Sequence, residues 1–441
     1  MTRNLRARLS NWVGDNALKR LIKNASFLFG AEALVTLISA VQFPLVTRWL
    51  GAENYGALGI VISSVALVGQ LLSFRLWETV IKYFTKYLMV NDEGRALAIL
   101  KLCLFIDFSM SAIIFAVISL AAGWLAALVV KRPDGADLIR LQAFHALVLV
   151  SMSVWMALLR VFDRFKFISA YNVVSAIALF ALSVIMLALG GGVAGMIIAA
   201  TLTNLGQTLI LTFLAGRELK SRFRRHWFTA DLRSLREDWH DIWVMLFSMN
   251  IDTLRKIAMN NADLVVLGWF TTPAQAGVYR LAKQLASYFG RLTNPVYDTL
   301  FPEVAKLYTT EGPARVRAMV TRLTRGIAIG LAGSFIGAYL FSGWLVPVIF
   351  GSEYIPAIPL FYIILLTNIL AIMLWAPSVL LSAGRAKQLT AINTISSLVM
   401  LTLLLVLTWR WGSVGTAIAL VSFHVTWLSL TYPATRKALA G

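Results

Sequence analysis

Long apolar runs recur along the chain, and they constrain its fold more than any other feature. A transmembrane helix needs about 20 apolar residues. Twelve runs near this length lie at roughly 25–47, 56–77, 97–123, 138–159, 168–189, 193–215, 242–269, 276–300, 326–350, 357–382, 389–409 and 413–433. Of the 441 residues, 59% are hydrophobic and 14% are charged, whereas soluble domains average about 25% charged residues. The sequence therefore predicts an all-α integral membrane protein with about twelve transmembrane helices.

The basic residues are distributed unevenly between the predicted loops. The net charge is +19, a value that also occurs in proteins that bind nucleic acid. With a cytoplasmic N-terminus, however, the inner segments contain 30 of the 40 basic residues and the outer loops contain 5. Such asymmetry is the positive-inside signature of multi-pass membrane proteins. We therefore expect a multi-pass protein of the cytoplasmic membrane with both termini in the cytoplasm, and no nucleic-acid partner.

Two halves of the sequence repeat each other. The Arg-x-Lys pattern at 164–166 recurs at 385–387, and the Gly-x-x-Gly pattern at 192–195 recurs at 412–415, so both patterns return after almost the same offset. Six helices per copy is an even number, so both copies enter the membrane in the same direction. This predicts two pseudo-symmetric six-helix lobes, related as parallel repeats, around a central cavity. The predicted boundaries are an N-lobe at 25–215, a basic cytoplasmic linker at 216–239 and a C-lobe at 240–441.

The segment 1–24 lies before the first apolar run and is rich in arginine and lysine. Its apolar residues alternate with basic ones, which is typical of an amphipathic helix on the inner leaflet. A disordered basic tail is the alternative. No cleavable signal peptide is apparent, because the first apolar run is long enough to span the membrane.

A polar, mostly cationic stripe follows two apolar helices predicted between Trp243 and Pro302, joined by a turn at Thr271–Ala276. Charged side chains are costly within a membrane, and they usually face a watery cavity or each other. We expect the stripe to line the path of a polar cargo. The alternative is internal pairing, such as Asp252 with Lys256, which would only hold the helices together. The predicted path residues are Arg255, Lys256, Arg280, Lys283, Gln284, Ser287, Arg291 and Asn294.

Four acidic residues are candidates for coupling transport to protons or sodium ions. Glu32 lies within the first apolar run and Asp263 in the outer half of the seventh, where a desolvated carboxylate has reason to bind a proton. Asp252 and Asp298 lie nearer the cytoplasm and are better placed to pair with neighbouring bases.

Chemical motifs of enzymes are missing from the sequence. It contains no His-Glu-x-x-His, no phosphate-binding glycine loop and no nucleophile elbow. The single cysteine, Cys103, excludes a zinc site made of cysteines, and the four histidines are scattered. The outer loops are also too short for the catalytic domain of a membrane ligase. We therefore expect neither enzyme activity nor a metal or cofactor.

Short motifs along nearly the whole chain resemble one known family. Residues 48–56 (RWLGAENYG) resemble the R-x-LG-x-x-x-YG signature of bacterial polysaccharide-unit flippases, the O-antigen branch of the multidrug/oligosaccharidyl-lipid/polysaccharide exporter superfamily. The chain departs from many relatives at 73–79 (SFRLWET), where they have a glycine-rich turn. Further matches are Gly277–Tyr279, Leu300–Pro302, Phe350–Tyr354, Gly384–Arg385 and Gly412–Ala417.

This resemblance implies a function in surface polysaccharide biosynthesis. Members translocate undecaprenyl-diphosphate-linked oligosaccharide units from the inner to the outer leaflet by alternating access. The implied partners are the lipid-linked cargo, membrane lipids and the polysaccharide polymerase machinery. Alternatives are a multidrug or cation exporter of the same superfamily, a membrane glycosyltransferase or polymerase, and a scaffold in which the charged stripes only join helices. A cation exporter would favour an acidic cavity, which the excess of Arg and Lys in the stripe does not predict.

Overall fold

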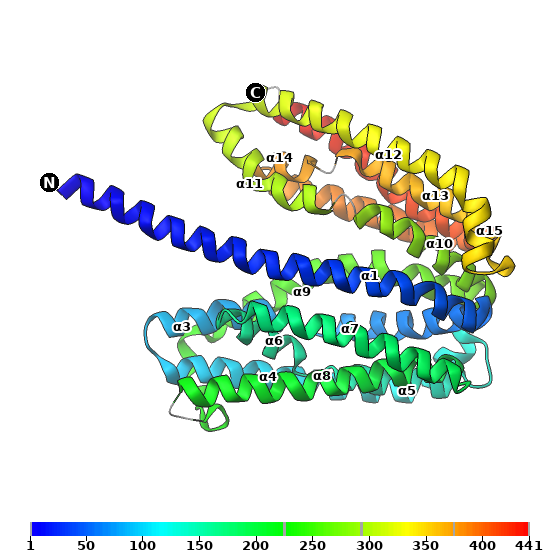
Figure 1. Cartoon of the computed structure of the whole chain (residues 1–441), viewed down its shortest axis with the longest axis horizontal. Helices are drawn as coiled ribbons and strands as arrows, with labels where there is room; N and C mark the ends of the chain where they lie inside the picture. Colours follow the sequence, from blue (N-terminus) through cyan, green and yellow to red (C-terminus); the bar gives the residue numbers. More distant parts are fainter. Residues whose placement is uncertain (1, 224–225, 292–293, 374, 440–441) are drawn as a thin grey trace. The chain divides into compact units, whose positions relative to one another are not determined.

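The chain is helical throughout the part that the structure describes. The computed structural model describes the backbone of residues 2–223, 226–291, 294–373 and 375–439, and it describes their side chains except at 2–25, 249–260, 291, 294–299 and 301–302. These residues form helices joined by short turns, without any strand among them (Figure 1). The predicted all-α class is confirmed.

The first half of the chain contains the helices up to the central linker. They are α1 (Thr2–Leu72), α2 (Leu76–Thr79), the π-helix η1 (Val80–Phe84), α3 (Thr85–Met89), α4 (Glu93–Leu125), the π-helix η2 (Ala126–Val130), α5 (Gly135–Val148), α6 (Met152–Val161), α7 (Phe165–Ala188) and α8 (Gly192–Arg222). The linker forms two 3-10 helices, η3 (Trp227–Thr229) and η4 (Leu232–Asp238). α8 extends further than the sequence predicts, so its last turn contains Lys220 and Arg222.

The second half begins with α9 (Trp239–Phe270) and α10 (Pro273–Arg291). It continues with α11 (Asn294–Thr310), α12 (Pro313–Ile349), the 3-10 helix η5 (Ser352–Tyr354), α13 (Ala357–Leu370), the 3-10 helix η6 (Ala371–Met373), α14 (Ala376–Ser382) and α15 (Ala386–Ala438). The turn between α9 and α10 is shorter than predicted, because Pro273 already begins α10. Proline suits this position, since the first turn of a helix leaves its N–H groups unpaired anyway.

Eight helices in the described residues are long and apolar enough to cross a membrane. Two of them, Ser26–Leu72 and Ala386–Ala438, contain 47 and 53 residues, about twice the length of one span. Each is broken by a glycine with positive φ, Gly51 at 71° and Gly412 at 55°, so each supplies two spans. The more polar α9 and the α10–α11 segment complete the twelve predicted runs. Leucine and tryptophan on the spans remain exposed, Leu120 at 88% and Trp124 at 68%, as expected of side chains that face lipid.

The backbone repeats in step with the sequence motifs. Left-handed residues occur at Asn91 and Gly312, at Lys131 and Gly351, at Asp163 and Gly384, and at Gly192 and Gly412. The members of each pair are separated by the offset of the sequence repeat, to within one position. Helices α4 and α12, which begin at Glu93 and Pro313, follow the same offset. The two halves are therefore structural copies of one unit.

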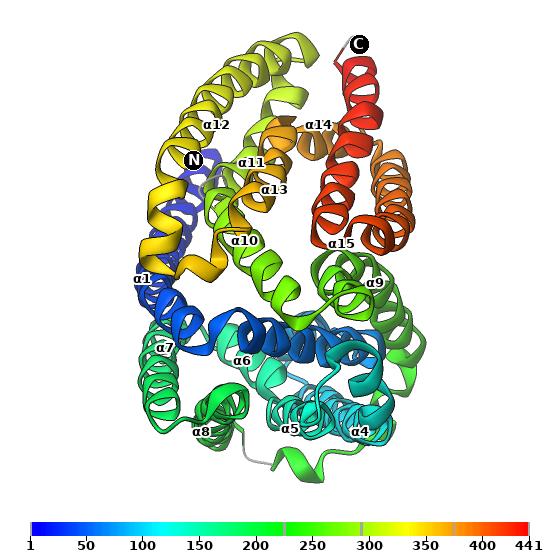
Figure 2. The ribbon, with the colours of Figure 1, turned by 90° about the vertical axis from the view of Figure 1, so that its right-hand side faces the viewer.

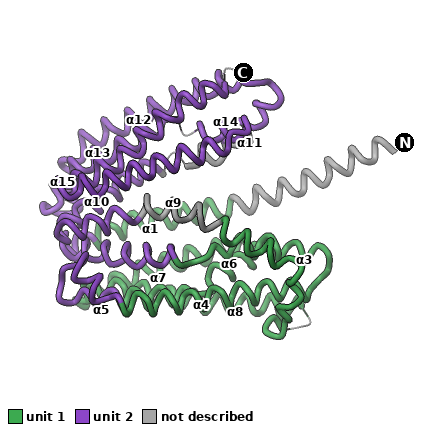
Figure 3. The backbone as a smooth tube through the Cα atoms, turned by 180° about the vertical axis from the view of Figure 1, so that it is seen from behind, with its two compact units in different colours: residues 1–46, 72–120, 140–252 green, residues 47–71, 121–139, 253–441 purple. Residues whose placement is uncertain are grey.

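The chain divides into two compact units (Figure 3). Unit 1 comprises residues 1–46, 72–120 and 140–252, and unit 2 comprises residues 47–71, 121–139 and 253–441. Each unit is described by itself below. Segments 47–71 and 121–139 come from the first half of the sequence but pack within unit 2, and the predicted lobe boundaries stay a prediction.

The core of unit 1 includes residues of the central linker. Leu97, Leu100 and Trp155 are buried together with Leu235, whose exposed fraction is 0%. Trp227 contacts Trp155 edge to face, with ring centroids 5.9 Å apart. The linker is therefore a packed part of unit 1.

Polar contacts hold the same linker at its end. Asp238 accepts hydrogen bonds from Lys86 Nζ at 2.8 Å and from the Tyr87 hydroxyl at 2.7 Å. Arg95 forms an ion pair with Glu237 at 2.8 Å. The Lys86 ammonium beside Asp238 holds the pKa of that carboxyl below its usual value. Because Asp238 is then charged at neutral pH, these contacts persist there.

One buried core of unit 2 lies among α11, α12, α14 and α15. Val316 and Val320 of α12 pack with Val379 and Leu380 of α14. α12 also runs beside α13, as both views of the ribbon show (Figures 1 and 2). This unit contains most of the predicted cationic stripe.

We predict that Leu235→Ala destabilises the protein by about 2–5 kcal/mol, because it leaves a cavity in the core of unit 1. Phe228→Ala on the same linker is the control, since Phe228 is 65% exposed. Thermal unfolding in detergent measures both. Equal effects of the two substitutions would contradict the description of the linker as part of the core.

Candidate functional site

Helix α10 of unit 2 has polar side chains along one face. Arg280, Lys283, Gln284 and Ser287 recur at spacings of three and four, so they share one face of the helix. All four are half-buried, and the neighbouring Ala286 is buried. Cationic and polar groups therefore line one side of an otherwise apolar helix within the unit.

Arg280 packs against the second half of α1. Its Nη1 donates to the Tyr55 carbonyl oxygen at 2.8 Å, and its guanidinium lies 4.2 Å from the centroid of the Tyr55 ring. Gly59 leaves the space that its stem fills, since a Cβ there would lie 2.7 Å from Arg280 Cδ. The guanidinium is stabilised by a cation–π contact and a carbonyl acceptor.

Lys283 is paired with a buried carboxylate on α9. Its Nζ donates to Asp263 Oδ2 at 2.5 Å, and the Tyr279 hydroxyl donates to the same oxygen at 2.6 Å. Asp263 and Tyr279 are both 0% exposed, while the Lys283 side chain remains 28% exposed. Asp263 thus neutralises a lysine that stays partly exposed.

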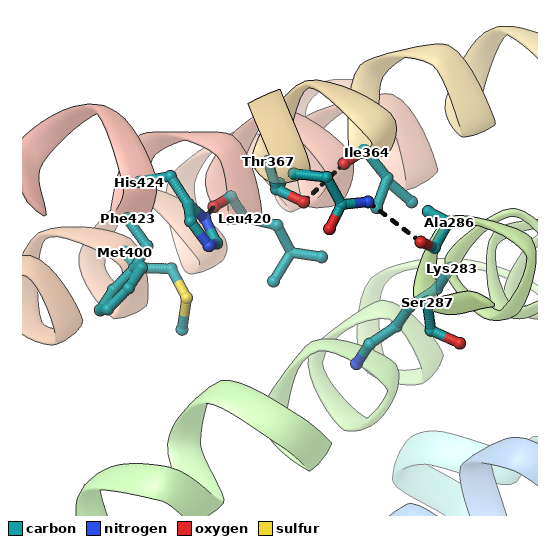
Figure 4. Close-up of a pocket in the computed structure, with 10 residues that line it drawn as sticks. Lys283, Ala286, Ser287, Ile364, Thr367, Met400, Leu420, Phe423 and His424 are labelled. Atoms are coloured by element: carbon teal, nitrogen blue, oxygen red, sulfur yellow. Dashed lines mark hydrogen bonds between the residues drawn. The ribbon is translucent and has the colours of Figure 1, made fainter. Parts of the chain in front are cut away.

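Lys283 lines a pocket of about 200 Å³ within unit 2 (Figure 4). Figure 4 shows Lys283 and Ser287 of α10 on one side, and Met400, Phe423 and His424 of α15 on the other. The remaining lining residues are Ala286, Ile364, Thr367, Asn368 and Leu420. An ammonium, two hydroxyls, an amide and an imidazole can together bind an anionic or hydroxyl-rich group.

The α13 side of the pocket is fixed by Asn368. Its Nδ2 donates to the Ala286 carbonyl oxygen at 3.0 Å. Gly290 permits this approach, because a Cβ there would lie 3.0 Å from Asn368 Oδ1. On α15, His424 Nδ1 lies 3.3 Å from the Leu420 carbonyl oxygen. The polar groups are therefore held by α10, α13 and α15.

Helices α1 and α10 cross with their backbones in contact, at what we call the glycine crossing. A Cβ on Gly56 would lie 1.7 Å from the Pro273 carbonyl oxygen, and a Cβ on Gly277 would lie 1.9 Å from the Ala52 carbonyl oxygen. Such distances are impossible for any side chain. Glycine is required at both positions because the helices approach so closely.

Residues around η5 brace this crossing. Glu353 Oε2 accepts from the Ala52 N–H at 3.1 Å, just after the break at Gly51. A carboxylate at the start of a helical segment satisfies an unpaired N–H and favours the helix dipole. The Tyr354 hydroxyl donates to the Thr47 carbonyl oxygen at 3.1 Å. The motifs at 47–56, 277–279 and 350–354 are thus brought together in unit 2.

The other predicted site residues have different positions. Gln284 is half-buried, and its backbone carbonyl oxygen accepts a hydrogen bond from the Ser287 hydroxyl at 2.7 Å. Glu32 is exposed on α1 in unit 1. The remaining predictions lie outside the described side chains, and they are Arg255, Lys256, Arg291, Asn294, Asp252 and Asp298.

Sequence reasoning missed several polar residues. Thr367 and Asn368 line the pocket. In the sequence they form a polar pair inside an apolar run, and this pattern could have indicated them. Asp107 of α4 in unit 1 was also missed, although it is an acid in a predicted span. Its Oδ2 accepts from the Ser151 N–H at 3.1 Å, where the helix is interrupted between α5 and α6. Within the described residues, no group of three or more His, Cys, Asp or Glu could hold a metal ion.

We predict that Lys283→Met and Asp263→Asn each destabilise the protein, and that the double variant recovers much of the loss. Removing one partner of a buried ion pair leaves an uncompensated charge and costs about 3–5 kcal/mol. Thermal unfolding in detergent measures this coupling. Additive losses in the double variant would show that the two side chains do not act as a pair.

We also predict that Gly277→Ala lowers thermal stability, because its methyl group cannot fit against Ala52. Gly206→Ala is the matched control, since nothing lies within 4 Å of an added Cβ there. Helical Gly→Ala changes normally stabilise by about 0.5–1 kcal/mol. A Gly277→Ala protein as stable as the control in thermal unfolding would contradict the crossing.

Comparison with known proteins finds relatives that match most of the chain. The inner membrane protein YghQ of Escherichia coli (strain K12) is 24% identical over 355 residues, which cover 79% of this chain and 98% of that protein. The putative O-antigen transporter of the same strain is 22% identical over 432 residues, which cover 95% and 98%.

Solved structures share the fold. A multidrug resistance MATE family transporter of the MOP superfamily, in an inward-facing conformation, matches with a TM-score of 0.74 at 13% identity, covering 91% of this chain and 94% of that chain. The lipid II flippase MurJ, in an inward closed conformation, matches with a TM-score of 0.67 at 13% identity, covering 95% and 89%. The model of the polysaccharide biosynthesis protein family matches residues 45–359, well over half of the chain. The chain therefore belongs to the polysaccharide biosynthesis protein family.

Proposed function

We propose that this protein is a flippase that moves undecaprenyl-diphosphate-linked oligosaccharide units across the bacterial cytoplasmic membrane by alternating access, for surface polysaccharide biosynthesis. The observation that supports this most is the pocket beside Lys283, in which a cation and several hydrogen-bonding groups lie inside a membrane-spanning helical unit. Family membership and the putative O-antigen transporter among its relatives agree with this cargo. Transport, rather than catalysis, is the role we assign.

The chemistry of the pocket suits a diphosphate attached to sugars. Lys283 supplies charge for phosphate, while Ser287, Thr367 and Asn368 supply donors and acceptors for sugar hydroxyls. An entering phosphate competes with Asp263 for the ammonium. We propose that the path continues along α10 and α9 through the other predicted stripe residues, with Arg280 at the end next to the glycine crossing.

The glycine crossing is our proposed outer gate. If both termini are cytoplasmic, α1 crosses the membrane once before Gly51, and the crossing lies near the outer surface. Outward release of a large cargo requires α1 and α10 to separate there. The polar contacts of Arg280 with Tyr55, and of Glu353 with the Ala52 N–H, hold the gate closed, and they must break when the helices separate.

We propose that an acidic residue within the membrane couples transport to protons or sodium ions. Asp263 contacts the cation that faces the pocket, so its protonation would release Lys283. Asp107 holds the interruption between α5 and α6 and is a second candidate. Glu32, Asp252 and Asp298 remain candidates from the sequence. Interaction with a polysaccharide polymerase is likewise part of the proposal.

Multidrug export is the alternative function within the same superfamily. We consider it because a multidrug resistance MATE family transporter shares the fold. A cationic drug favours a pocket with uncompensated acids. In the described part of the pocket lining, the charged residue is Lys283 and no acid is present. This charge favours an anionic cargo.

We predict that deleting the gene strands lipid-linked oligosaccharide on the inner leaflet and abolishes surface polysaccharide. Leaflet-resolved analysis of the lipid intermediate, together with polysaccharide staining, measures both. In a strain without a second flippase, unchanged polysaccharide would exclude the proposal and direct attention to drug susceptibility.

Complementation then tests the cationic path. Asp263→Asn/Lys283→Gln removes the lysine without leaving a buried charge, and we expect at least about tenfold less transport, since charge-assisted hydrogen bonds contribute about 1.5–3 kcal/mol. Lys437→Gln, an exposed cation at the end of α15, is the control. Full transport by the double variant at normal protein level would leave the function standing and exclude Lys283 from the path.

A further inference from the structure

A second and larger cavity of unit 2 has a strongly basic lining. It has a volume of about 610 Å³ and lies where α12, the segment before α14 and the end of α15 meet. Arg317 and Arg325 come from α12, and Arg436 comes from α15. The volume lies within the range of about 300–1,000 Å³ that small-ligand sites occupy.

The three arginines are exposed and their charge is not compensated in the cavity. Its described lining contains no acidic residue. None of the three arginines forms an ion pair within the part of the chain that the structure describes. The hydroxyl of Thr324, which accepts from Trp375 Nε1 at 2.8 Å, lies beside them. The cavity therefore offers three cations and several hydroxyl groups to an incoming anion.

The repeat provides an internal comparison for these positions. At the offset that relates Gly192 to Gly412, Arg317 corresponds to Leu97, which is 1% exposed in the core of unit 1. Thr324 corresponds in the same way to Leu104, which is 9% exposed. Positions that pack as leucine in one copy are thus an arginine and a threonine in the other. The positive-inside rule explains why arginines gather in cytoplasmic loops. It does not explain why positions that are packed in unit 1 carry polar residues in unit 2.

Unit 1 also shows what covers the corresponding surface. Trp155 corresponds to Trp375 at the same offset, and the linker residue Trp227 packs on Trp155. Lys101 Nζ on the neighbouring face donates to the Ala230 carbonyl oxygen of the linker at 2.9 Å. In unit 1 the chain itself fills this site, whereas in unit 2 the corresponding site is an open cavity lined by arginine.

We infer that this cavity binds the diphosphate group of a lipid-linked cargo at the inner leaflet, before the cargo reaches the pocket beside Lys283. The inference rests on the proposed function. Planar guanidinium groups form paired, charged hydrogen bonds with phosphate oxygens. Three of them match the charge of a diphosphate better than that of a phosphodiester headgroup, which has a single negative charge. The basic residues around the cavity belong to segments that the positive-inside rule assigns to the cytoplasmic side.

Binding to the purified full-length protein in detergent micelles tests the inference. The probes are geranylgeranyl diphosphate, inorganic pyrophosphate and phosphatidylglycerol. Arg317→Gln/Arg325→Gln/Arg436→Gln is compared with Arg322→Gln/Lys387→Gln/Lys437→Gln, which removes three exposed cations that do not line the cavity. We expect the cavity variant to bind geranylgeranyl diphosphate at least about tenfold more weakly, and the control to change less than about twofold.

The other outcomes are equally specific. Equal losses in both variants, or no loss in the cavity variant at unchanged thermal stability, would overturn the inference. Displacement of geranylgeranyl diphosphate by equimolar phosphatidylglycerol would identify a phospholipid site instead, and equally tight binding of pyrophosphate would identify a site for a free anion. Lysine at all three positions should restore part of the affinity, because it keeps the charge but loses the planar geometry. Since the assay needs no transport, its result is independent of the gene deletion.

Discussion

The ion pair between Asp263 and Lys283 is the interaction on which the polar part of unit 2 depends. A lysine inside an apolar helix bundle is costly unless an opposite charge meets it. Asp263 meets Lys283 from the neighbouring α9, and Tyr279 supplies a second hydrogen bond to the same oxygen. This arrangement lets α10 place an ammonium at a pocket without leaving a buried carboxylate unpaired. The remaining polar groups of the pocket then need only backbone acceptors such as the Ala286 carbonyl oxygen.

The repeat shows how one architecture provides two different surfaces. Turns with positive φ recur at the same offset, so the helices of the two halves begin and end alike. The side chains at corresponding positions differ between the two halves. Leu97 and Leu104 of α4 are buried in the core of unit 1, which includes linker residues, while Arg317 and Thr324 of α12 line a cavity in unit 2. The duplicated backbone preserves helix packing, and substitutions on one face alter what the face can bind.

Much of the fold could be predicted because membrane spans are local in sequence. Apolar runs of fixed length and the excess of Arg and Lys on one side require no knowledge of distant contacts. The glycine crossing is different, since Gly56 and Gly277 touch although half of the chain separates them. Their motifs could be recognised, but nothing local to either indicates which backbone the other approaches.

The sequence predicted the positive charge of the candidate site, but only some of the residues that line it. The spacing of Lys283 and Ser287 on one helix face indicated a polar path, and both line the pocket. Asp263 was predicted as an ion-coupling acid, and this role stays a prediction. Its ion pair with Lys283 on the next helix along the chain was not predicted. Thr367 and Asn368 required knowledge of how α13 packs on α10. Periodicity identifies a face of a helix, but it does not identify the neighbour of that face.

The two cationic sites of unit 2 differ in how their charge is balanced, and this difference suits transport. At Lys283 an anion must displace Asp263, so part of its attraction is offset by a competing carboxylate. In the arginine cavity no described acid competes. A conducting path requires sites favourable enough for entry and weak enough for release. In the path that we propose, an uncompensated entry cavity followed by an internally neutralised pocket would meet both requirements, because the cargo would be captured where no described acid competes and held less tightly where it must move on.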